Sequence, residues 1–142
     1  MINPESALEI DQLLSDYVYI IDDADWARLE DILTEDVIFD FTQFGLAYMN
    51  GRQTVITKFQ TMTHPIAHHA VNTLVKVQLD EYHLRSKMII AMGNGKTWYG
   101  EYRDIVVRSS TGLRFRSRTG VRPRAILSVR PKEFPTESPI ER

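Results

Sequence analysis

Residues 64–79, HPIAHHAVNTLVKVQL, mark the point where the period of the apolar pattern changes along the chain. Before this stretch, apolar side chains recur every three or four residues, as on one face of a helix. From Ala67 onward they alternate, as on a strand with one buried face. Pro65 lies at the change and cannot continue a helix. This stretch therefore predicts helices followed by a meander of strands, the order typical of an α+β fold.

Three helices are predicted on the N-terminal side. Asn3 and Pro4 form a helix start, with asparagine as the cap and proline in the first turn. An apolar stripe at helical spacing follows, through Ile10, Leu13, Leu14, Tyr17, Val18 and Ile21. Asp25 is expected to cap a short second helix, residues 37–41 form a strand, and Gly51 precedes the third helix.

Longer strands are predicted after the third helix, at residues 67–79, 82–92, 97–108 and 113–121. Gly93-Asn94-Gly95 and Ser110-Thr111-Gly112 are turn signals between consecutive strands, so we expect antiparallel neighbours. From Pro123 onward the chain holds four prolines and no clear period. We therefore predict one domain over residues 1–122 and a docked or loose tail over residues 123–142.

Composition excludes several classes of protein. A chain of 142 residues suits one domain, which buries roughly 70% of its unfolded surface. It contains no cysteine, which excludes zinc fingers, iron–sulfur clusters, disulfide scaffolds and thiol catalysis. No apolar run approaches the ~18 residues of a membrane span, and the N-terminus does not resemble a signal peptide. We therefore expect a cytoplasmic protein that does not bind membranes.

Charge is unevenly distributed. Residues 1–40 carry twelve acids and one base, whereas residues 103–130 carry eight arginines and one acid. A basic stretch is one signature of nucleic-acid binding. In residues 113–119, LRFRSRT, however, arginines alternate with apolar or small residues at the period of a strand. We therefore expect a solvated sheet face, partly paired with the acidic helices, and no nucleic-acid partner.

The two faces of the strand 67–79 differ in polarity. One carries Ala67, His69, Val71, Thr73, Val75, Val77 and Leu79. The other carries His68, Ala70, Asn72, Leu74, Lys76 and Gln78. Because the first is the more apolar, we expect it to face the core with His69, and His68 to face outward. A core histidine bonded to the backbone is the alternative interpretation of His69.

Imidazole, carboxylate and phenol groups could form an acid–base site if the fold gathers them. Tyr17 lies in the middle of the first helix's apolar stripe, and Asp22 lies at its edge. Imidazole titrates near neutrality, a carboxylate can fix its tautomer, and a phenol can polarise a carbonyl. A core tyrosine and a solvated helix-end carboxylate are the alternatives. Spacing along the chain does not by itself bring residue 69 to residue 22.

Several segments resemble the SnoaL-like branch of the nuclear transport factor 2-like superfamily. They are YVYIIDDADW at 17–26, TEDV at 34–37, Gly51-Arg52, AHHAVNT at 67–73 and GEYRD at 100–104. The resemblance implies a cone-shaped α+β barrel, in which three helices close a strongly bent, mostly antiparallel sheet around an apolar pocket. Members of the superfamily include scytalone dehydratase, ketosteroid isomerase, polyketide cyclases and bile-acid 7α-dehydratase.

The same resemblance implies roles for individual residues. The tyrosine, aspartate and histidine of the bile-acid dehydratase pattern fall on Tyr17, Asp22 and His69. The chain departs from both dehydratase patterns elsewhere. It has no acid on the strand that ends at Met92, and Ile21 and Phe41 stand where scytalone dehydratase has two tyrosines.

We therefore predict a cofactor-independent lyase or isomerase, dehydratase- or cyclase-like, acting on a hydrophobic cyclic molecule such as a polyketide or steroid. His69 is the predicted base or acid, Asp22 its orienting partner and Tyr17 the donor to the substrate oxygen. The candidate pocket wall is Phe41, Phe44, Tyr48, Met88, Met92 and Trp98.

Two alternatives use the same fold without catalysis. One is a module that binds a lipophilic ligand, and the other is a subunit-assembly module such as a dioxygenase β-subunit. We expect a homo-oligomer, a dimer or a trimer. His64, His68 and His69 are close in sequence, but adjacent strand residues point to opposite faces, so we expect no metal site.

Overall fold

A computed structural model describes residues 1–124 of the chain. In chain order its elements are α1 (Pro4–Asp22), η1 (Trp26–Arg28), α2 (Leu29–Ile32), β1 (Leu33–Asp40), η2 (Thr42–Phe44), β2 (Tyr48–Asn50), α3 (Arg52–Thr61), β3 (Ala67–Gln78), β4 (Glu81–Ala91), β5 (Thr97–Ser109) and β6 (Gly112–Val121). The apolar periods therefore predicted the helices and the long strands correctly. Of the predicted tail, only residues 123 and 124 are described, so the division at residue 122 stays a prediction.

Local chemistry explains where α1 begins and which face it buries. The side chain of Asn3 accepts a hydrogen bond from the backbone N–H of Ser6 at 2.8 Å, as predicted for a cap. The stripe that includes Leu13, Tyr17 and Ile21 is buried. The second predicted cap is wrong, since the side chain of Asp25 makes no capping hydrogen bond. There the chain enters the short 3₁₀ turn η1 before the four-residue α2.

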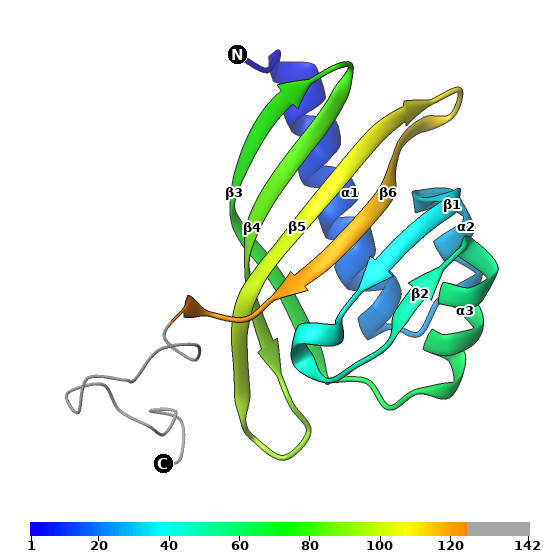
Figure 1. The fold of residues 1–142 in the computed structure, drawn as a ribbon, viewed down its shortest axis with the longest axis vertical. Coiled ribbons are helices and arrows are strands. Elements are labelled where there is room, and N and C mark those ends of the chain that lie inside the picture. Colours follow the sequence, from blue (N-terminus) through cyan, green and yellow to red (C-terminus); the bar gives the residue numbers. More distant parts are fainter. Residues whose placement is uncertain (125–142) are drawn as a thin grey trace.

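The strands form one curled sheet in the order β2-β1-β6-β5-β4-β3. Neighbours pair antiparallel except β1 and β6, which are parallel. Figure 1 shows α1 crossing one face of the long strands, with α2 and α3 grouped near β1 and β2. The α+β class, the three helices and the mostly antiparallel sheet are confirmed. The sheet does not close, however, because β2 and β3 remain as its edges.

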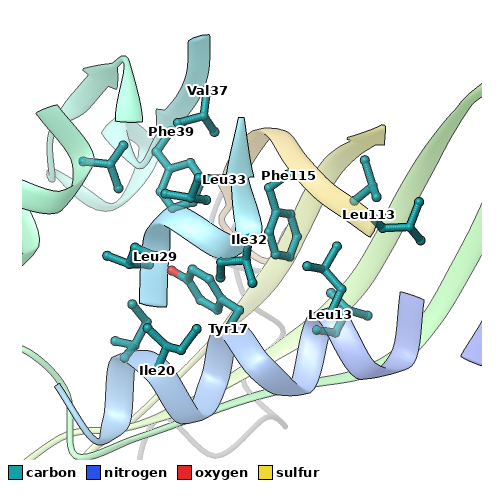
Figure 2. Close-up of a cluster of buried hydrophobic side chains, with 14 of the residues drawn as sticks. Leu13, Tyr17, Ile20, Leu29, Ile32, Leu33, Val37, Phe39, Leu113 and Phe115 are labelled. Carbon is teal, nitrogen blue, oxygen red and sulfur yellow. The ribbon is translucent and has the colours of Figure 1, made fainter. Parts of the chain in front are cut away.

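The core lies between α1 and the inner face of the sheet. Figure 2 shows Tyr17 of α1 among hydrocarbon side chains from α2, β1 and β6. Phe39 and Phe115 are fully buried and pack around the Tyr17 ring, with centroids 6.1 and 5.7 Å from it. Burial of this apolar surface is the main force that holds the helix against the sheet.

A β-bulge in β3 reverses the face predicted for its histidines. Val71 pairs with Lys87 and Leu74 with Arg85, so two residues of β3, Asn72 and Thr73, oppose one residue of β4. Asn72 has φ +53°, in the left-handed region that asparagine tolerates better than most residues. Since strand side chains alternate, the extra residue exchanges the inner and outer faces.

The prediction that His69 faces the core is therefore wrong. His68 and Ala70 lie on the inner face before the bulge, and Val75 packs on the core after it. His68 is only 6% exposed, whereas His69 is exposed to solvent. The predicted alternation is out of phase before the bulge and holds after it for Thr73 and Val75. Val77 and Leu79, which were also predicted to face the core, are exposed.

A second bulge, in β6, corrects the prediction of one solvated arginine face. Ile105 pairs with Ser117 and Val106 with Phe115, which leaves Arg116 as the extra residue. Arg116 stays near the surface and pairs with Glu81, as expected for a solvated face. Arg118, beyond the bulge, is instead fully buried.

Candidate functional site

An apolar pocket lies between the inner face of the sheet, α1, α3 and the segment between β1 and β2. Its volume is about 70 Å³. At about 10–15 Å³ for each water, this is room for about five to seven water-sized groups. The lining residues are Tyr17, Ile21, Phe41, Phe44, Leu46, Phe59, Met62, His64, Pro65, His68, Met88, Ile90, Trp98 and Tyr102.

His68 forms one polar part of this lining, and it is paired with the carboxylate of Asp22 behind it. Asp22, the last residue of α1, receives the Nδ1–H of His68 on Oδ1 at 2.6 Å. Its Oδ2 accepts the backbone N–H of the same histidine at 3.0 Å. Because an ionised carboxylate only accepts hydrogen bonds, Nδ1 carries the proton in the neutral ring. Nε2 is then left with its lone pair, which is the form of imidazole that can take a proton.

Burial controls the protonation of this histidine. It lowers the pKa of the His68 imidazole below the ordinary histidine value, and the hydrogen bond and charge of Asp22 oppose it only in part. The positive charge of Arg118 and the nearby His64 lower the pKa further. His68 is therefore neutral at neutral pH and able to act as a base.

Two phenols line the same pocket. Tyr17 comes from α1 and Tyr102 from β5, and each side chain is 2% exposed. Their ring centroids are 6.4 Å apart, with an interplanar angle of 71°. Burial raises the pKa of both phenols above the usual tyrosine value. Both hydroxyls therefore keep their protons at neutral pH and are available as hydrogen-bond donors.

A buried ion pair lies against these phenols. Arg118 on β6 donates from Nε and Nη2 to the two carboxylate oxygens of Asp104 on β5, both at 2.8 Å. The side chains of both residues are 0% exposed. Burial lowers the pKa of Arg118, but the charge and hydrogen bonds of Asp104, with smaller contributions from the two phenols, outweigh it and raise the pKa above the usual arginine value. The arginine is therefore charged inside the core.

The structure brings together most of the residues predicted for the site. Tyr17 and Asp22 lie beside the pocket with a histidine, although the histidine is His68. Four of the six predicted wall residues line the pocket: Phe41, Phe44, Met88 and Trp98.

The other two predicted wall residues do not line the pocket. Tyr48 is 56% exposed, because on the short edge strand β2 it is the neighbouring Met49 that points inward. Met92 follows the end of β4 and packs beside Met88 and Ile90 without reaching the pocket.

Three residues of the site were missed: His68, Tyr102 and Arg118. The signal for His68 was Asn72 in the middle of the strand, since asparagine is suited to the positive φ of a bulge. For Arg118 the signal was the lone acid of the basic stretch, Asp104, on the neighbouring strand of the hairpin.

Of the three histidines that are close in sequence, His64 and His68 line the pocket and His69 does not. His64 Nε2 lies 2.7 Å from the backbone carbonyl of Phe59, and its ring lies 4.9 Å from that of Trp26. His69 is exposed on the outer face. Within residues 1–124 no three His, Cys, Asp or Glu side chains are arranged to hold a metal ion. Within the same residues, no helix is both long and apolar enough to span a membrane.

The sequence was compared with known protein families and with curated proteins. Residues 4–119 match the SnoaL-like domain family. No curated protein matches the sequence.

Solved structures share the fold. A proposed aromatic ring hydroxylase from Novosphingobium aromaticivorans is 25% identical, with a TM-score of 0.74, over 85% of this chain and 91% of that one. A proposed scytalone dehydratase from the same organism is 21% identical, with a TM-score of 0.65, over 81% of this chain and 82% of that one. A protein of unknown function with a cystatin-like fold from Nostoc punctiforme is 17% identical, with a TM-score of 0.72, over 86% and 95% of the two chains.

Proposed function

The chain belongs to the SnoaL-like domain family, and from that premise we propose that it is a cofactor-independent acid–base lyase or isomerase acting on a hydrophobic cyclic molecule. The observation that carries the proposal is the 2.6 Å contact between His68 Nδ1 and Asp22 Oδ1, with the imidazole lining the same apolar pocket as Tyr17. A fixed imidazole tautomer, a neutral phenol and a hydrocarbon wall are the parts that proton abstraction beside a carbonyl requires.

In the proposed reaction, His68 acts as the base. Its Nε2 takes a proton from the carbon next to a ring carbonyl, and the electron pair of that C–H bond forms an enolate. Tyr17 donates a hydrogen bond to the carbonyl oxygen as negative charge develops there. In a dehydration, the bond to a hydroxyl on the next carbon then breaks, and the imidazolium returns its proton so that water leaves. In an isomerisation, the proton returns to another carbon of the enolate.

Asp22 acts through the histidine. Its carboxylate holds the Nδ1–H and stabilises the imidazolium that forms when the base takes a proton. The second oxygen, bonded to the backbone N–H of His68, ties the end of α1 to the start of β3. The two hydrogen bonds therefore hold the ring in position.

The small volume of the pocket limits the substrate. Drug-sized ligands commonly need cavities of about 300–1,000 Å³. The pocket volume here is about 70 Å³, so this conformation suits a compact ring or the reacting part of a larger molecule. Phe44 and Trp98, stacked with centroids 5.9 Å apart, form part of the wall.

Two single-ring ketones test the proposal. 3-Hydroxycyclohexanone loses water to give cyclohex-2-enone, and cyclohex-3-enone isomerises to the same product, whose conjugated absorbance reports both reactions. We expect the protein to accelerate at least one of them. His68→Gln should lower the rate by about 10²–10⁴-fold, the usual contribution of a positioned base.

The matched control is the next residue, His69→Gln, which changes the same side chain on the outer face and should leave the rate unchanged. If His68→Gln reacts as fast as the wild type, the assignment of the base is wrong. If His69→Gln alone loses activity, the outer face carries the chemistry.

A binding or assembly role is the second candidate. The observation in its favour is the likeness to the proposed aromatic ring hydroxylase, because a chain of this fold could serve as a structural subunit of such an enzyme. Binding of the ketones without any acceleration, measured by ligand-observed NMR, would support this candidate. A dimer or trimer and a cytoplasmic location stay predictions. Light scattering during size-exclusion chromatography tests the dimer or trimer, and cell fractionation tests the location.

A further inference from the structure

We propose that Phe44 is the specificity-determining residue of the pocket. Its ring occupies the place where the second ring of a fused-ring ligand would lie, so the pocket accepts single-ring ketones and excludes bicyclic ones. The proposal deepens the proposed function and rests on it for the kind of ligand. The size limit itself stands on contacts of Phe44 that the proposed reaction does not use.

Two glycines form the surface on which the Phe44 ring lies. Gly100 of β5 pairs with Met88 of β4, and Gly120 of β6 pairs with Tyr102 of β5. A Cβ at Gly100 would lie 2.9 Å from Phe44 Cζ, and a Cβ at Gly120 would lie 3.2 Å from Phe44 Cε2. Carbon atoms in ordinary contact are about 3.5–4.0 Å apart, so a side chain at either position would have to displace the ring. We call the space above Gly100 and Gly120, which the Phe44 ring fills, the glycine slot.

Trp98 gives the glycine slot an aromatic wall. The rings of Trp98 and Phe44 are stacked, with centroids 5.9 Å apart and an interplanar angle of 13°. Trp98 lies two residues before Gly100 on β5, so both face the same side of the sheet. Aromatic rings favour offset stacking of this kind. The surroundings that hold the Phe44 ring would therefore also suit the flat ring of a ligand.

The glycine slot lies in the direction in which a bound ligand would extend from the base. His68 of β3 pairs with Ile90 of β4, and Ile90 pairs with Trp98 of β5. Neighbouring strands are about 4.8 Å apart, so β5 is about 10 Å from β3. A ligand whose first ring lies beside His68 and β4 therefore brings a fused second ring to β5, where Phe44 already lies.

Phe44 belongs to a surface loop outside the acid–base pair. This loop, residues 41–47 between β1 and β2, is closed in part by the backbone N–H of Phe44, which donates to the Phe41 carbonyl at 3.0 Å. Figure 1 shows the loop beside the end of β6. There the backbone N–H of Arg122 donates to Oε1 of Gln43 at 3.0 Å. The loop therefore holds the ring over the glycines, and the Phe44 side chain can be changed without altering the pair of His68 and its carboxylate.

The experiment compares the affinities of two ketones that share one ring. In 1-tetralone, a benzene ring is fused on the double bond of cyclohex-2-enone. Burial of the four added carbons should tighten binding about 100-fold wherever the pocket has room for them. We expect the wild type to bind 1-tetralone no more tightly than cyclohex-2-enone. Phe44→Ala should bind 1-tetralone at least about 10-fold more tightly than the wild type does. Its affinity for cyclohex-2-enone should change less than about threefold, because the wall beside His68 is unchanged. Ligand-observed NMR measures both affinities.

Two further variants test whether the slot itself sets the limit. Leu46→Ala is the matched control, because it shortens another side chain of the same loop that lines the same pocket. The atoms nearest to a Cβ at either glycine include atoms of Phe44 and none of Leu46, so Leu46→Ala should keep the wild-type preference. Gly120→Val, added to Phe44→Ala, places a side chain where the ring was. It should return the affinity for 1-tetralone to within about threefold of the wild-type value.

Circular dichroism confirms that each variant is folded. Equal losses of affinity for both ketones in Phe44→Ala would show that the ring only packs the core, and would overturn the proposal. Unchanged affinities in that variant, or an equal gain for 1-tetralone in Leu46→Ala, would also overturn it. So would a wild type that already prefers 1-tetralone, or binding of neither ketone by the wild type and Phe44→Ala.

His68→Gln separates this proposal from the proposed function. It should abolish turnover and leave the ratio of the two affinities within about threefold of the wild-type ratio, because the histidine is not part of the glycine slot. The expected affinities without turnover in any variant would retain the size limit and remove the catalytic proposal. Turnover that depends on His68, with a ratio of affinities that Phe44→Ala does not change, would do the reverse.

Discussion

The buried pair of Arg118 and Asp104 allows a sharp test of how this core is stabilised. Arg118→Met leaves the carboxylate of Asp104 without its cation in a site where both side chains are 0% exposed. Breaking such a pair costs about 3–5 kcal/mol in the free energy of unfolding. For a chain of this size, at about 3–4 °C for each kcal/mol, Tm should fall by about 10–20 °C.

The double change Arg118→Met with Asp104→Leu removes both charges. It leaves no lone charge in the core, so we expect stability within about 1 kcal/mol of the wild type, or above it. Urea unfolding followed by circular dichroism measures the free energy of unfolding of all three proteins. Equal m-values would confirm that the three expose similar surface on unfolding. The single and double variants should therefore differ by at least about 2 kcal/mol in favour of the double.

An exposed pair on the same sheet supplies the matched control. Arg85 binds both carboxylate oxygens of Glu101, at 2.7 and 2.9 Å, but its side chain is 56% exposed. This pairing lowers the pKa of Glu101 to about 2. Arg85→Met should nevertheless cost less than about 1 kcal/mol, because water screens the charges.

A double variant of the buried pair as unstable as Arg118→Met would refute the reasoning. It would show that contacts of the guanidinium with the three rings of Tyr17, Tyr102 and Phe115, rather than charge burial, stabilise the core.

Three further predictions follow from the pocket and its strands. First, burial lowers the folded-state pKa of His68, so its contribution to stability is complete above the ordinary value of about 6.5 and is lost as the pH falls through the lower folded value. Urea unfolding between pH 8 and 5 should show that the free energy of unfolding falls less with acid in His68→Gln than in the wild type. An equal fall in both proteins would contradict this role of His68. Second, Gly100→Ala places a Cβ 2.6 Å from the Val121 carbonyl oxygen and 2.8 Å from a side-chain atom, and should cost about 1–3 kcal/mol. Gly93→Ala, whose nearest contact is 3.8 Å, is the control, and comparable losses of Tm in the two variants would count against this packing argument. Third, Asn72→Val should cost about 1–2 kcal/mol at its positive φ, while Asn72→Gly should be near neutral; similar Tm values for the two would argue against a strained bulge.

Much of the fold could be predicted from local rules. The helical stripe on α1 and the alternation along the later strands predicted the element order, because each period depends only on the geometry of its own element. Asn3 is an effective cap for the same reason, since its partner is three residues away. Tyr17 lies in the pocket wall and Asp22 contacts His68, at the positions on α1 that the phase of an uninterrupted helix gives them.

The errors at the site share one physical cause. His68 precedes the bulge of β3, and Arg118 follows the bulge of β6. At each bulge one extra residue exchanges the two faces of the strand. A bulge is defined by the pairing of two strands, so the pattern of one strand alone does not contain it. Tyr48 and Met92 were wrongly predicted to line the pocket for a related reason. Which side chains face inward on a short edge strand or at the end of a strand depends on the neighbouring elements.

The sequence by itself determined that three helices would cover a mostly antiparallel sheet and that a phenol and a carboxylate would lie along one helix. It predicted the imidazole at His69, whereas the structure places His68 inside and His69 outside. Only the tertiary structure decided which of the two imidazoles meets the carboxylate, and that an arginine lies buried beneath two tyrosines. The physical reason is that helix phase and strand alternation are local, whereas strand register depends on hydrogen bonds to a partner distant in the chain.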